Sequence, residues 1–527
     1  MSLRRARPIE EALRQVRDRA LGLTNAGRLR RHEPAAHLPV KEQRRLVQLL
    51  HACLEPHLGE VIARARAAEI AALYLGLDEE GRARFFQLVA TGSAIDPSRV
   101  ELAADAFHTA VAVSEAGRPA STDGPTSQDD NALLLRRADP AVAKAASALR
   151  EAATPAWDRL FRLFCGLDHG VKFTVDLRAD LLAALAAARR GVVAEGFEQA
   201  LLQRFDNDLR AVLKALFDVG LLQLHRITWQ SPAALLEKLI RYEAVHAITS
   251  WADLKNRLRE DRRCYAFIHP GMPDEPLIFV EVALSTGFAH RIGPLLDLET
   301  PITVDDDADS AIFYSISSCQ DGLTGVSLGD FLIKQVVTDL ARELPGVKHF
   351  ATLSPIPGFR VWLTDELQHS PVQLLGLLDG EQRTSLASLS AIPPTPQNSN
   401  GGHRSGLSAS GTASGGLARL LDDNSWLDDP ATASTARPAI VRLAARYLTS
   451  IGEDQRVVDR VGNFHLTNGA RVERVNWLAN PSQEGVRQSL GVMVNYRYDL
   501  DRIERNHTDY VLRGRVAISP AVSRLLG

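Results

Sequence analysis

The 527-residue sequence predicts an α+β protein in which an N-terminal all-α helical bundle precedes a mixed α/β domain. Through about residue 218, apolar residues recur at helical spacing and β-branched runs are scarce. From residue 219, strand-like runs alternate with segments that carry helix-capping signals. A chain of this length exceeds one hydrophobic core, so we place the domain boundary where the pattern changes, giving domains 1–218 and 219–527.

Amphipathic helices account for the first domain. Apolar residues fall on one face of a predicted helix at Phe205, Leu209, Val212, Leu213 and Leu216. Another packed helix is predicted around Leu181, Leu182 and Leu185. Helical bundles commonly serve as scaffolds or oligomer contacts, and no group of residues in this one indicates chemistry.

Strands and capped helices open the second domain. Two helix starts are indicated, one by Ser231 before Pro232 and one by Ser250 with Asp253. The third predicted strand alternates apolar residues with serines, as a half-buried strand does. The three predicted strands are Cys264–Ile268, Leu277–Leu284 and Ala311–Ser318.

Composition argues against several classes of protein. The 61 basic and 64 acidic residues nearly balance, so no global field attracts nucleic acid or anionic lipid. No apolar run approaches the roughly 18 residues that a membrane-spanning helix needs. The four cysteines form no C-x-x-C pair, which favours free thiols in a reducing compartment. The Arg-rich start contains Glu10, Glu11 and Asp18, so we interpret it as an amphipathic helix. The Ala- and Arg-rich composition favours a bacterial source, for which we expect a cytoplasmic location.

Two polar segments of the second domain carry no predicted chemistry. Residues 391–416 are nearly all Pro, Gly, Ser, Asn and Thr, a composition that predicts a disordered insertion. A run of aspartates lacks the glycine turn and the terminal glutamate of a calcium-binding loop, so we predict a solvated loop and no metal site. That run comprises Asp305, Asp306, Asp307 and Asp309.

The segment from Ala311 to Phe359 predicts a strand, a glycine-bearing loop, a helix and a second strand. The helix begins at Ser327 and ends before Pro345, and the second strand spans Val347–Leu353. Glycines in the loop let a ligand approach the backbone, and free N–H groups at the helix start suit a phosphate. Neither GxxxxGK[ST] nor GxGxxG is present, so the residues alone favour an ordinary αβ unit with a glycine turn.

The order of these elements resembles the pyrophosphate-binding unit of the GNAT acyltransferase superfamily, in which CoA lies between two splayed strands. Five motifs narrow the resemblance: FYSIS at 313–317, GVSLGDFLIKQVV at 325–337, LSPIPGF at 353–359, NFHLTNGA at 463–470, and NW-LA with NYRY at 476–498. In this order they resemble the malonyl-CoA decarboxylase family, and the resemblance extends from about Trp229 to Tyr498.

The resemblance implies an enzyme that converts malonyl-CoA to acetyl-CoA and CO2 through an enolate. Ser354 matches the family's active-site serine, a proton acceptor, and His465 matches its proton-donating histidine. Tyr498, which ends NYRY, is a candidate for orienting the carboxylate, and packing in the core is the alternative role for it. The resemblance also implies a homotetramer and no metal or cofactor beyond the CoA of the substrate. The CoA-binding candidates are Thr324, Gly325, Val326, Ser327, Leu328, Gly329 and Asp330.

Local sequence gives these residues simpler interpretations beside the functional ones. Ser354 precedes two prolines and could cap a stiff turn. Asn468-Gly469 predicts a hairpin, which would place His465 on a strand just before a tight turn. The pKa of an ordinary histidine lies near neutrality, which suits a proton donor.

Two other functions remain open from the sequence. An N-acyltransferase could use the same fold, because a fold does not fix its chemistry. A non-catalytic acyl-CoA-binding protein, with the helical domain contacting partners, would need no catalytic pair. Amine acceptors would identify the transferase, and tight malonyl-CoA binding without a product would identify the binding protein.

Overall fold

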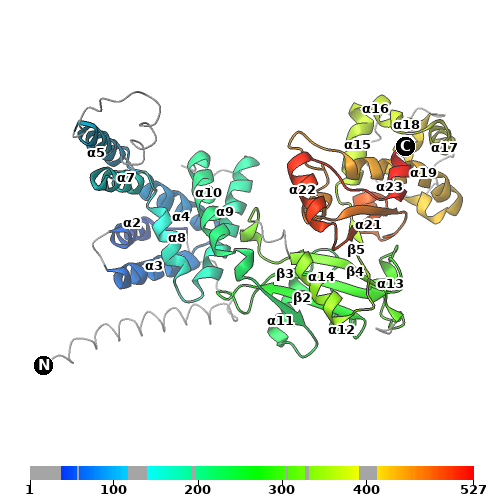
Figure 1. Ribbon diagram of the computed structural model, residues 1–527, viewed down its shortest axis with the longest axis horizontal. Helices are drawn as coiled ribbons and strands as arrows, with labels where there is room; N and C mark the ends of the chain where they lie inside the picture. Colours follow the sequence, from blue (N-terminus) through cyan, green and yellow to red (C-terminus); the bar gives the residue numbers. More distant parts are fainter. Residues whose placement is uncertain are drawn as a thin grey trace, which may run out of the picture. The chain divides into compact units, whose positions relative to one another are not determined.

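The structure is a computed structural model that describes residues 37–55, 59–116, 139–191, 198–303, 307–326, 332–390 and 412–527 (Figure 1). The chain forms two compact units. The first contains the residues through Asp218 together with 320–326, and the second contains 219–319 and 327–527. A short piece of the second half of the sequence therefore belongs to the helical unit.

The described residues of the first unit form α-helices and one short 3-10 helix, η3 (Asp321–Leu323). Its core lies where α8, α9 and α10 meet, and Phe205 packs edge-on against Trp157 and Phe161. In the predicted stripe Phe205, Leu209 and Leu213 are buried, and the other two residues are half-buried. The α-helices are α2 (Val40–Leu54), α3 (Glu60–Leu75), α4 (Glu79–Gly92), α5 (Pro97–Ala116), α7 (Pro140–Ala152), α8 (Trp157–Cys165), α9 (Gly170–Arg189) and α10 (Gln199–Leu216).

The second unit contains a mixed sheet of order β1-β2-β3-β4-β5-β8-β6, and β7 also pairs with β8. Only β4 and β5 are parallel among these pairs, because α14 (Leu332–Glu343) crosses over between them. The three predicted strands are confirmed as β2, β3 and β4. The strands are β1 (Gln223–Ile227), β2 (Arg262–Ile268), β3 (Pro276–Ser285), β4 (Ser310–Ser318), β5 (His349–Thr352), β6 (Ser354–Pro355), β7 (Arg471–Asn476) and β8 (Met493–Tyr498).

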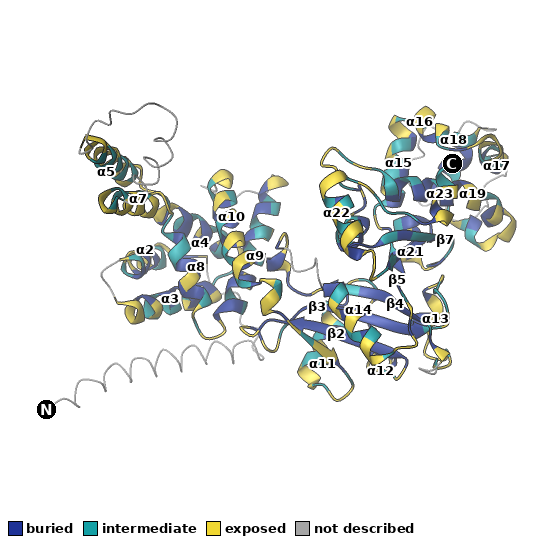
Figure 2. Ribbon diagram, in the orientation of Figure 1, coloured by how far each residue is buried: buried dark blue, intermediate teal, exposed yellow. Residues whose placement is uncertain are grey.

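Strand β4 is buried on both faces, so the prediction of a half-buried strand is wrong. Figure 2 shows β2, β3 and β4 dark blue along most of their length. The serines that suggested an exposed face, Ser315 and Ser317, are themselves buried, and a buried carboxylate accepts their hydroxyl hydrogen bonds. Alternation of polar and apolar residues therefore marks a polar interior here.

Helices surround the sheet, and several of them form a helical insertion between β6 and β7. Within the insertion α17 packs on α18 and α19, and α15 also contacts α18 and α19. The helices of this unit are η1 (Val219–Leu221), α11 (Ala233–Tyr242), α12 (Trp251–Arg257), α13 (Gly293–Leu296), α14, α15 (Phe359–His369), α16 (Pro371–Gly376), α17 (Gly380–Ser390), α18 (Ala413–Asp422), η4 (Ser425–Asp428), α19 (Pro430–Thr449), α20 (Arg460–Thr467), α21 (Gln483–Ser489), α22 (Ile503–Arg513) and α23 (Pro520–Leu526).

Local signals were correct at some helix ends and wrong at others. Ser250 caps α12 as predicted, its side chain accepting the Asp253 N–H at 3.1 Å. Pro232, not Ser231, occupies the N-cap position of α11, and the Ser231 hydroxyl instead accepts the Thr228 N–H. Of the insertion predicted to be disordered, 391–416, residues 391–411 lie outside the described residues. The chain is helical from Ala413, so the predicted disorder is wrong for the last residues of the tract.

The predicted strand–loop–helix–strand unit is present as β4, η3, α14 and β5. Leu332, Val336 and Leu340 lie on the buried face of α14, and the turn at Pro345-Gly346 follows the helix. The predicted helix start at Ser327 lies outside the described residues. In the part of the chain that the structure describes, no helix is long and apolar enough to span a membrane.

Candidate functional site

Strands β4 and β5 separate at the point where the candidate serine lies. Their parallel ladder runs from Ser310 opposite His349 to Phe313 opposite Thr352. One further hydrogen bond joins them, from the Leu353 N–H to the Phe313 carbonyl at 2.9 Å. Beyond that bond the ladder with β4 ends, whereas the pairing with β8, which begins in β5, continues in β6, so Ser354 occupies the fork between the two parallel strands.

His465 lies on a helix, α20, and the predicted strand and hairpin are wrong. The Asp459 side chain caps this helix by accepting the Gly462 N–H at 2.6 Å. Asn468 is the C-cap, and Gly469 follows with φ +80°. The Asn-Gly pair does supply the left-handed conformation that it signals, but this conformation ends a helix here and does not turn a hairpin.

Folding brings Ser354, His465 and Tyr498 into one hydrogen-bonded row. The Ser354 Oγ lies 3.1 Å from His465 Nε2, and His465 Nδ1 lies 2.7 Å from the Tyr498 hydroxyl. The three side chains come from β6, α20 and β8, and all are buried. The sequence separation of the three residues explains why only the tertiary fold can assemble the row.

Burial keeps this row electrically neutral. Desolvation lowers the pKa of His465 to about 3 and raises that of Tyr498 well above its usual value. The imidazole also stacks on the Tyr496 ring at 4.6 Å between centroids. The pKa near neutrality expected from an ordinary histidine is therefore not the one this site produces.

A neutral imidazole carries one proton, and the neighbours indicate which nitrogen holds it. The Ser354 hydroxyl donates to Thr352 Oγ1 at 2.8 Å, so it can accept from His465 Nε2–H. Nδ1 is then free to accept from the Tyr498 hydroxyl. The hydrogen bonds run in one direction, from Tyr498 through His465 to Ser354, so that a proton donor faces the serine.

Two buried polar residues that sequence reasoning missed hold the row in place. Thr352 accepts from both Ser354 and the Tyr496 N–H, and Asn495 donates through Nδ2 to the Thr352 carbonyl at 2.6 Å. Both residues are fully buried. Their only sequence signal is a polar side chain inside an otherwise apolar strand.

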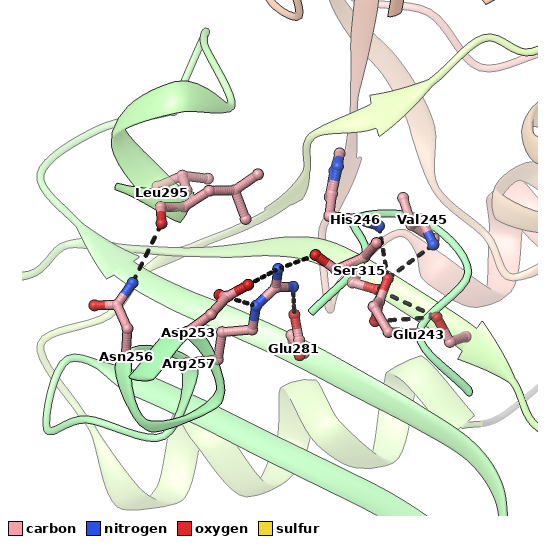
Figure 3. Close-up of polar contacts among 12 residues, drawn as sticks. Glu243, Val245, His246, Asp253, Asn256, Arg257, Glu281, Leu295 and Ser315 are labelled. Atoms are coloured by element: carbon pink, nitrogen blue, oxygen red, sulfur yellow. Dashed lines mark hydrogen bonds and ion pairs between the residues drawn. The ribbon is translucent and has the colours of Figure 1, made fainter. Parts of the chain in front are cut away.

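A second polar cluster lies beneath β3 and β4, and the sequence did not predict it. The Glu243 carboxylate, at the end of α11, accepts a hydrogen bond from the Ser315 hydroxyl (Figure 3). It also accepts one from the Ser317 hydroxyl. Arg257 bridges the carboxylates of Asp253 and Glu281, both at 2.9 Å. Burial raises the pKa of Glu281 to about 7. These contacts fix the half of β4 that lies beyond its ladder with β5.

The candidate CoA-binding residues fall in two groups. Thr324 and Gly325 are exposed and Val326 is buried, and all three belong to the first compact unit. The others, Ser327, Leu328, Gly329 and Asp330, lie outside the described residues, as do Asp305 and Asp306. Among the described residues, no group of three His, Cys, Asp or Glu side chains could hold a metal ion.

A buried serine, neutral histidine and tyrosine at a strand fork form a site suited to proton transfer, and the class of protein they define is an enzyme. Family models identify which enzymes the chain resembles. The malonyl-CoA decarboxylase C-terminal domain matches residues 220–527, and the malonyl-CoA decarboxylase N-terminal domain matches 129–217. The chain belongs to the malonyl-CoA decarboxylase family.

Individual relatives support this assignment. The mitochondrial malonyl-CoA decarboxylase of Anser anser anser is 36% identical over 378 residues, covering 70% of this chain and 69% of the relative. The Mus musculus protein of the same name is 36% identical over 388 residues, 72% of each chain. Two solved malonyl-CoA decarboxylases have the same fold. That of Rhodopseudomonas palustris matches with a TM-score of 0.72 and 36% identity over 92% of this chain and 99% of its own. That of Agrobacterium vitis matches with a TM-score of 0.71 and 35% identity, covering 92% of this chain and 100% of its own.

Proposed function

We propose that this protein is a carboxy-lyase that converts malonyl-CoA to acetyl-CoA and CO2. Membership of the malonyl-CoA decarboxylase family over both matched domains is the observation that carries the proposal. The buried row of Ser354, His465 and Tyr498 supports it, because this decarboxylation ends with a proton transfer to carbon.

The reaction itself dictates what the site must supply. The bond between the carboxylate carbon and Cα breaks, CO2 leaves, and the electron pair moves into the thioester carbonyl to give an enolate. Donors must stabilise the developing charge on that oxygen, and an acid must protonate Cα. The thioester carbonyl is the electron sink, so we propose that no metal or separate cofactor takes part.

His465 and Ser354 are proposed to manage the carboxylate and the proton. With the hydrogen bonds directed as described, His465 Nε2–H points toward Ser354, which lies at the fork. The negative carboxylate of bound malonyl-CoA would raise the pKa of the buried imidazole, which would favour its protonated form in the complex. Tyr498 would hold the ring through Nδ1.

A GNAT-like mode of binding is proposed for the acyl-CoA arm. In that mode the arm enters between two splayed parallel strands, and the fork of β4 and β5 after Phe313 and Thr352 provides such strands. Backbone N–H groups beside the fork would donate to the thioester oxygen. The segment Thr324–Asp330 would receive the pyrophosphate.

The oligomeric state and the cellular location are also proposals. We propose a homotetramer that the helical unit helps to build, which sedimentation of the full chain would test against its 57.6 kDa subunit mass. We also propose a cytoplasmic location, although the curated Anser and Mus relatives are named as mitochondrial. Cell fractionation of the native host would distinguish these two compartments.

Incubation of the purified full chain with malonyl-CoA tests the proposed function. Mass spectrometry should detect acetyl-CoA and CO2 in equal amounts, and boiled protein provides the control. Intact malonyl-CoA after prolonged incubation would contradict the proposal. A scan of amine acceptors with acetyl-CoA would then test for acyl transfer.

A further inference from the structure

A buried arginine of α9 holds the loop formed by residues 320–326. The Arg178 Nη1 donates to the carbonyls of Gly322 and Thr324, at 2.7 and 2.8 Å. Its Nε donates to Asp206 at 2.8 Å, and only 2% of the arginine is exposed. Burial of a guanidinium is costly unless its donors are paired. The ion pair with Asp206 and the hydrogen bonds to the two loop carbonyls provide that pairing. Arg178 therefore fixes the backbone of this loop.

Close packing against α9 also fixes this loop at Gly322. A Cβ added to Gly322 would lie 1.8 Å from the Val175 carbonyl oxygen, so no side chain fits there. Gly322 is thus a packing glycine, whereas the sequence had suggested a glycine that lets a ligand approach. The loop cannot move off the helix without losing this contact and the Arg178 hydrogen bonds.

Fixing the Thr324 carbonyl also fixes the direction of the next N–H. The peptide between Thr324 and Gly325 is trans, so the Gly325 N–H points away from the carbonyl that Arg178 binds. Gly325 is exposed with φ +76°, and within the described part of the chain its N–H has no hydrogen-bond partner. An exposed N–H on a rigid loop suits an anionic ligand.

A second arginine brings positive charge to the same place. The Arg210 guanidinium, on α10, lies beside Gly325, with Nη1 3.7 Å from the position of an added Cβ. Arg210 is exposed and has no ion-pair partner among the residues that the structure describes. An unpaired guanidinium next to a free N–H is complementary to a phosphate.

We propose that the loop of residues 320–326 and the helices that hold it, α9 and α10, bind a phosphate of CoA. Arg178 is a positioning residue that sets the conformation of residues 320–326, and Arg210 binds a phosphate of CoA beside the Gly325 N–H. This inference rests on the proposed function for its ligand. It assigns a role in substrate binding to a domain whose sequence indicated only a scaffold.

Comparison of two substrates tests the proposal. Malonyl-pantetheine lacks the phosphates of malonyl-CoA but carries the same reacting group. Arg178→Lys and Arg210→Gln should each raise the KM for malonyl-CoA by about 10- to 100-fold, as expected for loss of hydrogen bonds to charged groups, with kcat little changed. Both variants should process malonyl-pantetheine as wild type does. Equal losses on the two substrates, or no loss on malonyl-CoA, would overturn the proposal.

Matched variants control for general damage to the helical unit. Arg82→Lys alters another ion pair of α9, that with Asp180, and Arg204→Gln removes another exposed arginine of α10. Both should behave as wild type on both substrates. Where Arg178→Lys does not fold, Arg178→Met/Asp206→Leu removes both buried charges together and should give the same rise in KM.

Calorimetric titration separates this proposal from the proposed function, since it needs no turnover. Wild type should bind CoA more tightly than either variant does, whereas pantetheine should bind all three proteins equally. That result supports the loop assignment even where malonyl-CoA proves not to be a substrate. Unchanged CoA affinity in both variants refutes the loop assignment even where the enzyme decarboxylates malonyl-CoA.

Discussion

At the scale of single residues, the candidate site contains a histidine, His465, that burial keeps neutral. The motifs LSPIPGF, NFHLTNGA and NYRY identified Ser354, His465 and Tyr498 from sequence, and the fold places the three in contact. The pKa of His465 could not be read from the sequence, because desolvation lowers it and desolvation is a property of the packed structure. The positioning roles of Thr352 and Asn495 could not be read from the sequence either, because their hydrogen bonds form only in the packed structure.

Tyr498→Phe removes the hydroxyl that holds His465 Nδ1 while keeping the ring. The loss of a hydrogen bond to a buried group costs about 1–3 kcal/mol, so kcat should fall about 5- to 150-fold. Steady-state kinetics with malonyl-CoA would measure it. Unchanged kcat would show that the hydroxyl does not position the imidazole.

The neutral state of His465 makes stability depend on pH. Its pKa is about 3 in the native chain and near 6.5 unfolded, so between these values only the unfolded state binds the proton. The stabilisation is complete above pH 6.5 and is lost as the pH falls towards 3. From pH 7.5 to 5.0, wild type should lose about 2 kcal/mol more unfolding free energy than His465→Gln does. Equal losses in denaturant titrations would argue that the histidine titrates normally.

At the scale of elements, two local signals were real but had a different structural outcome. Asn468-Gly469 does supply a left-handed residue, yet it terminates α20, because the apolar residues before it pack as a helix. The alternation in β4 is also real, yet both faces are buried since Glu243 lies beneath the serines. Local sequence specifies backbone conformation well, but it does not specify what will cover a face.

Gly469→Ala should destabilise the protein through the end of α20. The residue has φ +80°, and an added Cβ would lie 2.2 Å from the Ile503 carbonyl oxygen. Strain of this kind costs on the order of 1–3 kcal/mol, and the clash adds to it. Gly380→Ala is the matched control, because an added Cβ there has open space. Equal melting temperatures for the two variants would contradict the strain at Gly469.

At the scale of the whole molecule, the sequence predicted helices followed by a mixed sheet, and the structure confirms that fold class. Periodicity reports each element separately, so it could not reveal that residues 320–326 pack with the helical unit. Nor could periodicity reveal the helical insertion between β6 and β7, because the helices of the insertion have the same apolar periodicity as other helices of the chain. Long-range packing decides both features.

The most direct test of proton transfer through His465 is decarboxylation of malonyl-CoA in D2O by wild type, Ser354→Ala and His465→Ala. Mass spectrometry would follow the rate and the deuterium content of the acetyl-CoA. Wild type should place one deuterium in the methyl group, and His465→Ala and Ser354→Ala should each be slower by about 10²–10⁴-fold if the pair delivers the proton. Near-normal turnover by His465→Ala would remove the histidine from the mechanism.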